Sequence, residues 1–106
     1  MVEIVRTQSF ERSVKALGVS DAELQALENE IVANPAVDAV IKGLKGVRKI
    51  RFALGGKGKS GGGRAVYLAI RVRDAAYLLL AYTKNSQSDL SNAHRKAVLD
   101  LLETLK

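Results

Sequence analysis

The sequence predicts an α+β fold, in which two N-terminal helices and one C-terminal helix pack on a small antiparallel sheet in the order βααβββα. Apolar residues recur at helical spacing in the first third and at the end of the chain, whereas in the middle they alternate with polar residues. The connections between the middle strands are short, which favours antiparallel neighbours. The length of 106 residues fits one domain, residues 1–106.

The first third is predicted to form a short strand and two helices. Residues 3–6 are expected as the strand, followed by a helix around residues 9–17 that ends at a glycine. Ser20 and Glu23 stand in the capping-box pattern, in which the hydroxyl and the carboxylate satisfy free backbone N–H groups reciprocally. The apolar residues that follow at helical spacing are Leu24, Leu27 and Ile31. The second helix should run to about Asn34, because a proline follows and cannot continue it.

The middle of the chain is predicted to form a meander of three strands. After Gly46 the period changes to two, so one strand has an apolar face and a basic face. The apolar set is Ile50, Phe52 and Leu54, and the opposite set is Lys49, Arg51 and Ala53. Residues 55–63 are a loop, since six of the nine are glycine. Residues 64–71 and 76–83 are the next two strands.

The last helix is predicted to start at Ser91, whose hydroxyl can cap it. Its apolar stripe consists of Val98, Leu101, Leu102 and Leu105. We expect the helices to pack on one face of the sheet. The other face would then be free to carry Lys49 and Arg51.

The positive charge is concentrated in the middle third of the chain. The net charge is +6, yet residues 1–38 hold three Lys/Arg against seven Asp/Glu, and residues 74–106 hold four of each. Residues 39–73 hold ten Lys/Arg and no acidic residue. Such clustering points to a polyanionic partner, because Lys and Arg release counterions from phosphates. A solvated basic face without a partner is the alternative.

Several classes of protein are excluded or disfavoured. The absence of cysteine excludes disulfides, thiolate zinc sites and a cysteine nucleophile, and it suits a cytoplasmic protein. The first residues lack the layout of a signal peptide, and the longest apolar run, Ala75 to Tyr82, is too short to cross a bilayer. We therefore expect a soluble protein without a membrane partner, a metal site or a cofactor.

Two sequence patterns resemble nucleotide-binding motifs without their structural context. The segment Gly56 to Gly61 matches G-x-G-x-x-G, and Ala53 to Ser60 matches a relaxed P-loop. Both motifs need a helix N-terminus directly after the loop to hold the phosphate, whereas a strand is predicted here. A glycine-rich hairpin loop is the better interpretation. His94, the only histidine, is interpreted as a solvated residue of the last helix.

Five segments follow one another in an order that a known family shares. They are Asn34-Pro35 at a helix end, Val47-Arg48-Lys49-Ile50-Arg51, Gly58 to Tyr67, Leu78 to Asn85, and Asp89-Leu90-Ser91. Together they resemble the RelE/ParE toxin superfamily, and within it the HigB-like branch. The resemblance covers about Asn34 to Ser91 and agrees with the βααβββα order.

The resemblance implies a ribosome-dependent endoribonuclease that inhibits translation and is held inactive by an antitoxin. In such enzymes the mRNA 2′-hydroxyl attacks the adjacent phosphate, and basic side chains neutralise the developing charge. Arg64 matches the family's catalytic arginine, with a structural or phosphate-positioning role as its alternative. Arg48, Lys49 and Arg51 would bind the RNA backbone, unless they form a solvated strand face.

The remaining candidates lie in the glycine loop and at the end of the last strand. Lys57 and Lys59 could close over RNA. Tyr82 could stack on a base or belong to the core, and Lys84 could protonate the leaving oxygen or pair with phosphate. The resemblance leaves the general acid and base open, because RelE has an arginine and a tyrosine where this chain has Asn85 and Ser91.

Two other functions remain open from the sequence. A ParE-like, non-enzymatic inhibitor of DNA gyrase would share the fold, and a basic nucleic-acid-binding module would share the charge. Both toxin hypotheses predict a cognate antitoxin that covers the groove, and a helix-turn-helix protein is the expected kind. The nuclease hypothesis adds the ribosome and mRNA as partners.

Overall fold

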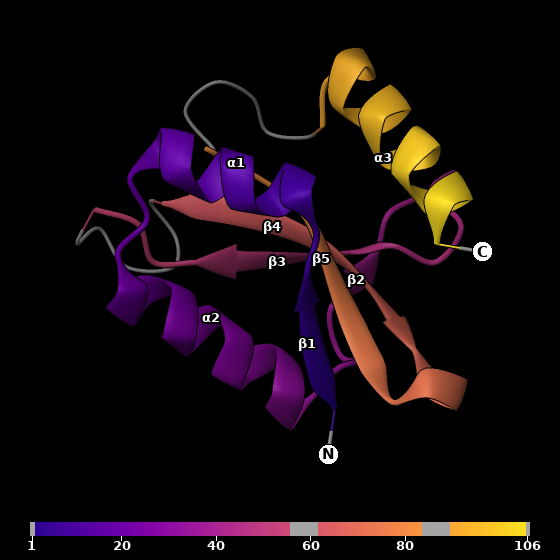
Figure 1. The fold of residues 1–106 in the computed structure, drawn as a ribbon, viewed down its shortest axis with the longest axis horizontal. Coiled ribbons are helices and arrows are strands. Elements are labelled where there is room, and N and C mark those ends of the chain that lie inside the picture. The colour runs from indigo at the N-terminus through magenta and orange to yellow at the C-terminus, as the bar shows by residue number, and fades with distance from the viewer. Residues whose placement is uncertain (1, 56–61, 84–89, 106) are drawn as a thin grey trace.

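The computed structural model describes residues 2–55, 62–83 and 90–105, which form three helices and a five-stranded sheet (Figure 1). The helices are α1 (Gln8–Leu17), α2 (Asp21–Ala33) and α3 (Asn92–Thr104). The strands are β1 (Glu3–Arg6), β2 (Ala39–Val40), β3 (Arg48–Phe52), β4 (Gly63–Ile70) and β5 (Ala75–Thr83), and a short 3-10 turn, η2 (Arg71–Arg73), joins β4 to β5. These elements confirm the predicted α+β fold and most of its boundaries.

The sheet is mixed rather than wholly antiparallel. Its strand order is β1-β5-β4-β3-β2, and the predicted meander of β3, β4 and β5 is antiparallel. β1, however, pairs parallel with β5. β1 is followed by two helices and pairs with β5, which is distant in the sequence. No short connection therefore determines whether β1 runs parallel or antiparallel to β5. β2 was not predicted, because two exposed residues show no periodicity.

Helix caps account for the positions of the first two helices. The Thr7 hydroxyl caps α1 by accepting from the N–H of Phe10 and also donates to the Leu78 carbonyl of β5, at 2.8 Å. Gly18 ends α1 with φ of 72°, a conformation that glycine adopts without strain. The predicted capping box of α2 is confirmed, with Ser20 and Glu23 bonded reciprocally at 3.1 and 3.0 Å.

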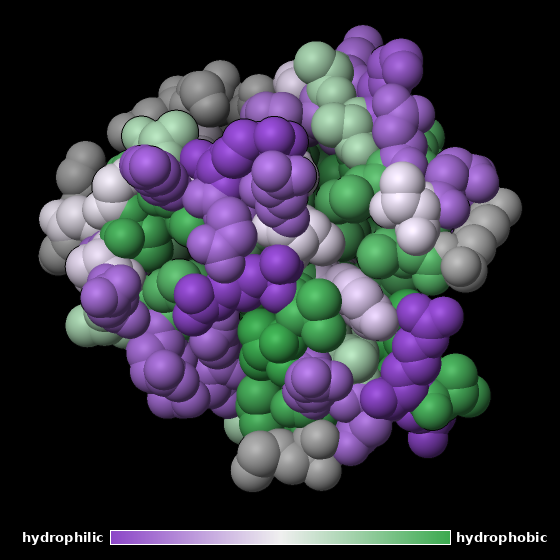
Figure 2. Space-filling view, in the orientation of Figure 1, coloured by the Kyte–Doolittle hydropathy of each residue, from purple (hydrophilic) through white to green (hydrophobic). Residues whose placement is uncertain are grey.

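Two apolar clusters pack on opposite faces of the sheet. On one face, α1 and α2 cover side chains of β3, β4 and β5 such as Phe52 and Tyr67. Figure 2 shows hydrophilic residues over the outer surfaces of these helices and hydrophobic residues between them. On the other face, Val98 and Leu102 of α3 pack with Leu79 and Tyr82. The expectation that this second face would be free was therefore wrong.

A register shift between β4 and β5 enlarges the apolar surface on which α3 packs. Val66 pairs with Leu80 and Tyr67 with Leu78, so Leu79 is an extra residue in β5. Both Leu79 and Leu80 consequently contact the cluster under α3, which strict alternation would forbid. The bulge lets one strand supply two consecutive leucines to one face.

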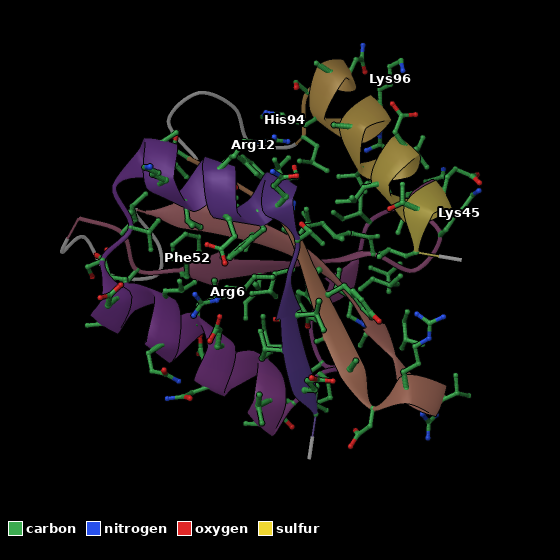
Figure 3. The ribbon with its side chains drawn as sticks, viewed as in Figure 1. Arg6, Arg12, Lys45, Phe52, His94 and Lys96 are labelled. Atoms are coloured by element: carbon green, nitrogen blue, oxygen red, sulfur yellow. The ribbon has the colours of Figure 1, made fainter. Side chains whose placement is uncertain are left out.

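One ion pair ties β1 to α2. Arg6 Nε lies 2.6 Å from Glu28 Oε2, and Glu28 is only 8% exposed. The hydrogen bond from this guanidinium to Glu28 raises the pKa of Arg6. Figure 3 shows Arg6 between β1 and α2, with Phe52 deeper between the two helices. The pair thus fixes α2 over the sheet, where its last turn borders the site described next.

Candidate functional site

A hollow of about 790 Å³ lies along the outer edge of β3. β2 pairs only with Arg48 and Lys49, so from Ile50 onward the described residues place no strand on the outer edge of β3, the side away from β4. The last turn of α2 and the segment that follows it form the opposite wall. The lining residues are Glu30, Ala33, Asn34, Val37, Asp38, Ala39, Lys49, Ile50, Arg51 and Arg64.

One wall of the hollow is cationic. Arg51 and Arg64 are direct partners in the β3–β4 ladder, and Lys49 pairs with Val66 two residues along. Paired residues of antiparallel strands point to the same side, so Lys49, Arg51 and Arg64 share one face of the sheet. That face is the one α3 covers further along, since Val66 belongs to the α3 cluster. The sequence-predicted convergence of these three cations is therefore observed.

Arg64 is the most constrained of these cations. It is 8% exposed, and its Nη1 donates to the Gly63 carbonyl at 3.0 Å. Within residues 2–55, 62–83 and 90–105, Arg64 makes no ion pair, whereas buried charges are ordinarily paired. A guanidinium has five N–H donors, so most of this capacity remains for a ligand. The arrangement suits an anion that offers two oxygens side by side, such as a phosphate.

Close packing fixes the start of the strand that carries Arg64. Gly63 pairs with Phe52, and a Cβ built on Gly63 would lie 2.4 Å from Phe52 Cζ. Only glycine lets β4 approach β3 this closely over the ring. The ring of Phe52 is itself 1% exposed, between α1 and α2. The backbone before Arg64 is consequently held by the core.

Tyr82 and His94 extend the row of polar side chains across the sheet. Tyr82 pairs with Arg64 in the β4–β5 ladder and is 3% exposed, so its ring belongs to the core and is not placed to stack on a base. The His94 ring lies 5.9 Å from it, tilted by 42°. His94 is half-buried in the first turn of α3, on the side towards the sheet (Figure 3). The interpretation of His94 as a solvated residue was wrong, because partial burial and the contact with the Tyr82 ring place it against the sheet.

The second wall is rich in hydrogen-bond acceptors. Glu30 and Asn34 come from the end of α2, and Asp38 comes from the segment before β2. The Tyr67 hydroxyl donates to Asp38 Oδ2 at 2.7 Å, and Arg48 donates to the Asp38 carbonyl. Arg48 pairs with Tyr67 on the face opposite to Lys49, so it builds this wall rather than lining the hollow. No sequence signal marks the acceptors of this wall, since Glu30, Asn34 and Asp38 precede the basic third.

Three of the predicted site residues, Lys57, Lys59 and Lys84, lie outside the described residues. The glycine loop leads into β4 rather than into a helix, which removes the context that a P-loop requires. In the described part of the chain, no group of three or more His, Cys, Asp or Glu residues could hold a metal ion. No helix among these residues is long and apolar enough to cross a membrane.

Solved structures with the same architecture include several bacterial proteins. A mutant of the E. coli toxin RelE in the free state has a TM-score of 0.60 at 17% identity, covering 94% of this chain and 97% of that one. The isolated E. coli RelE toxin has a TM-score of 0.57 at 18% identity, covering 95% and 99%. A conserved hypothetical protein, HP0892 from Helicobacter pylori, has a TM-score of 0.57 at 19% identity, covering 80% and 97%.

These likenesses define the fold class, a small α+β fold that the two E. coli RelE structures share with this chain. The family described as the RelE toxin of the RelE/RelB toxin–antitoxin system matches residues 2–105. The chain belongs to this RelE toxin family.

Proposed function

We propose that this toxin is a ribosome-dependent endoribonuclease that cuts mRNA, and that it is of the HigB-like kind. The observation that carries the proposal is Arg64, a buried guanidinium that lines the hollow without an acidic partner among the described residues. A bound phosphate would strongly stabilise a buried cation whose donors are unused. Lys49 and Arg51 beside it supply the further positive charge that a ribose-phosphate chain requires.

The proposed reaction is an intramolecular phosphoryl transfer. The 2′-oxygen of one nucleotide forms a bond to the adjacent phosphorus while the bond to the 5′-oxygen breaks. The 2′-hydroxyl proton passes to a base, and the 5′-oxygen gains a proton, which leaves a cyclic phosphate and a 5′-hydroxyl end. Arg64 would neutralise the charge that develops on the phosphate, in the manner of an oxyanion-hole donor. We propose Lys57, Lys59, Lys84 and Tyr82 as the remaining catalytic candidates, without assigning the acid or the base.

The proposal includes partners and location. Residues 1–106 would act as one domain, bound to mRNA on the ribosome in the cytoplasm. A cognate antitoxin, for example a helix-turn-helix protein, would inhibit the toxin by covering the hollow. Its contacting segment would have to be acidic or amphipathic, because the wall formed by Lys49, Arg51 and Arg64 is cationic.

The test is a translation reaction that contains a defined mRNA and purified toxin. Cuts within the coding sequence are expected when ribosomes translate it, and none when ribosomes are omitted. Intact mRNA in a translating reaction would contradict the proposal. If DNA supercoiling by gyrase were inhibited at the same time, the ParE-like alternative would replace it.

Arg51→Ala is expected to weaken RNA binding in a salt-dependent way. Arg51 is exposed and lines the hollow, so its contact with a phosphate releases counterions when RNA binds. The slope of log affinity against log salt should become shallower by about 0.7. The measurement is fluorescence anisotropy with a 2′-O-methyl single-stranded RNA that cannot be cut. Arg71→Ala, an exposed arginine of η2 outside the hollow, is the control and should leave the slope unchanged.

A further inference from the structure

The two walls of the hollow have opposite electrostatic character. The β3–β4 wall presents Lys49, Arg51 and Arg64, whereas the α2 wall presents Glu30, Asn34 and Asp38. The last turn of α2 contains no basic residue, so the negative end of its dipole is not offset there. A phosphate is attracted by the first wall and repelled by the second. A bound strand would therefore be oriented with its phosphates on the sheet and its bases towards α2.

Asp38 is a positioned acceptor on the α2 wall. The Tyr67 hydroxyl, which belongs to a fully buried side chain, holds Asp38 Oδ2 at 2.7 Å. Burial, together with the hydrogen bond to Asp38, raises the pKa of Tyr67, so the phenol stays protonated and donates. Arg48 fixes the Asp38 backbone through its carbonyl. In the described part of the chain, Asp38 Oδ1 has no hydrogen bond, and a carboxylate oxygen only accepts.

The sheet register separates this acceptor from the phosphate site. Tyr67, which holds Asp38, pairs with Arg48, whereas Arg64 pairs with Arg51. These two levels are three residues apart, about 10 Å along β3, and their side chains point to opposite faces of the sheet. That separation is comparable with the length of a nucleotide from its phosphate to the far edge of its base. Because Asp38 and Arg64 line the hollow from opposite walls, a phosphate on Arg64 would have its base, rather than its 2′-hydroxyl, directed towards Asp38.

We propose that Asp38 reads a base of the bound RNA and selects bases with an exocyclic amino group, which are adenine, cytosine and guanine, over uracil. The inference rests on the proposed function, because it assumes that a phosphate occupies the Arg64 site. An amino group donates to a carboxylate, whereas the uracil carbonyls that flank its N–H group repel it. Tyr67 is a positioning residue, since it acts only by orienting Asp38.

The test is a map of all cut positions on a pool of mRNAs in a translating reaction. With the natural protein, one nucleotide position next to the cut should be depleted in uracil by about tenfold, the size of one specific contact. Asp38→Asn turns one acceptor into a donor and should bring uracil to within about twofold of the other bases. Tyr67→Phe keeps the ring but releases the carboxylate, so it should reduce the depletion in part. Asp100→Asn on α3 is the matched control and should keep the full preference.

A second measurement does not depend on how the variants fold. The natural protein is given one mRNA with adenine at the selected position and a matched mRNA with purine, which lacks only the amino group. The adenine mRNA should be cut about tenfold faster. If the natural protein cuts mRNA but shows equal rates here, or if Asp38→Asn retains the uracil depletion, base reading by Asp38 is wrong while the nuclease function stands. If the natural protein cuts nothing, the proposed function fails and this inference fails with it.

Discussion

Replacing Arg64 with alanine should lower the rate of mRNA cleavage by about 10²–10³-fold, the loss typical for one transition-state donor. Arg64 is buried and lines the hollow, and in the described chain its side chain makes one hydrogen bond, to a backbone carbonyl. Its charge and its remaining donors are thus available for the phosphate as negative charge develops. Arg64→Lys should recover only part of the rate, because an ammonium cannot form the two parallel bonds of a guanidinium.

The measurement is single-turnover cleavage on ribosomes that hold a defined mRNA, at saturating toxin. Saturation separates the chemical step from weaker binding. Arg71→Ala serves as the control for the loss of one positive charge, and thermal unfolding shows whether Arg64→Ala still folds. A folded Arg64→Ala protein that cuts within threefold of the natural rate would exclude Arg64 from the chemistry.

Gly63→Ala should destabilise the fold by about 1–3 kcal/mol, the usual cost of overpacking a core. The added Cβ would lie 2.4 Å from Phe52 Cζ and 2.5 Å from Phe52 Cε1. Phe52 cannot move away easily, because α1 and α2 enclose it. The free energy of unfolding in urea checks the prediction, and the slope of the transition shows whether the unfolded state has changed.

A double mutant distinguishes the clash with Phe52 from other effects of replacing Gly63. Phe52→Leu removes the ring that meets the new methyl group, so Gly63→Ala should cost much less in that background. The coupling between the two substitutions should be about 1 kcal/mol or more, as for residues in contact. Equal costs of Gly63→Ala in both backgrounds would show that the Phe52 contact does not fix the start of β4.

The local elements could be predicted because their signals are local. The capping box of Ser20 and Glu23, the glycine at the end of α1 and the Ser91 cap each act within a few residues. The alternation around Ile50 and Phe52 likewise gives the buried face of β3. The parallel pairing of β1, the short β2 and the bulge at Leu79 could not be predicted, since they depend on contacts between distant segments.

The cationic wall was predictable, whereas the rest of the site was not. Lys49 and Arg51 share a strand face by alternation, and Arg64 opens the next strand, so antiparallel pairing is enough to bring them together. Asp38 lies in a segment without periodicity, and only the fold places it in the wall opposite Lys49. The position of His94 could not be predicted either, because its contact with Tyr82 depends on how α3 packs on the sheet.

The most direct test of the nuclease proposal is the chemical state of the mRNA ends after the toxin has acted on translating ribosomes. A 2′-hydroxyl attack assisted by Arg64 leaves a cyclic phosphate on the upstream fragment and a 5′-hydroxyl on the downstream fragment. Sequencing that discriminates these ends should find both at every toxin-dependent cut, and neither with Arg64→Ala. Uncut mRNA, or downstream fragments that begin with a 5′-phosphate, would contradict the proposal.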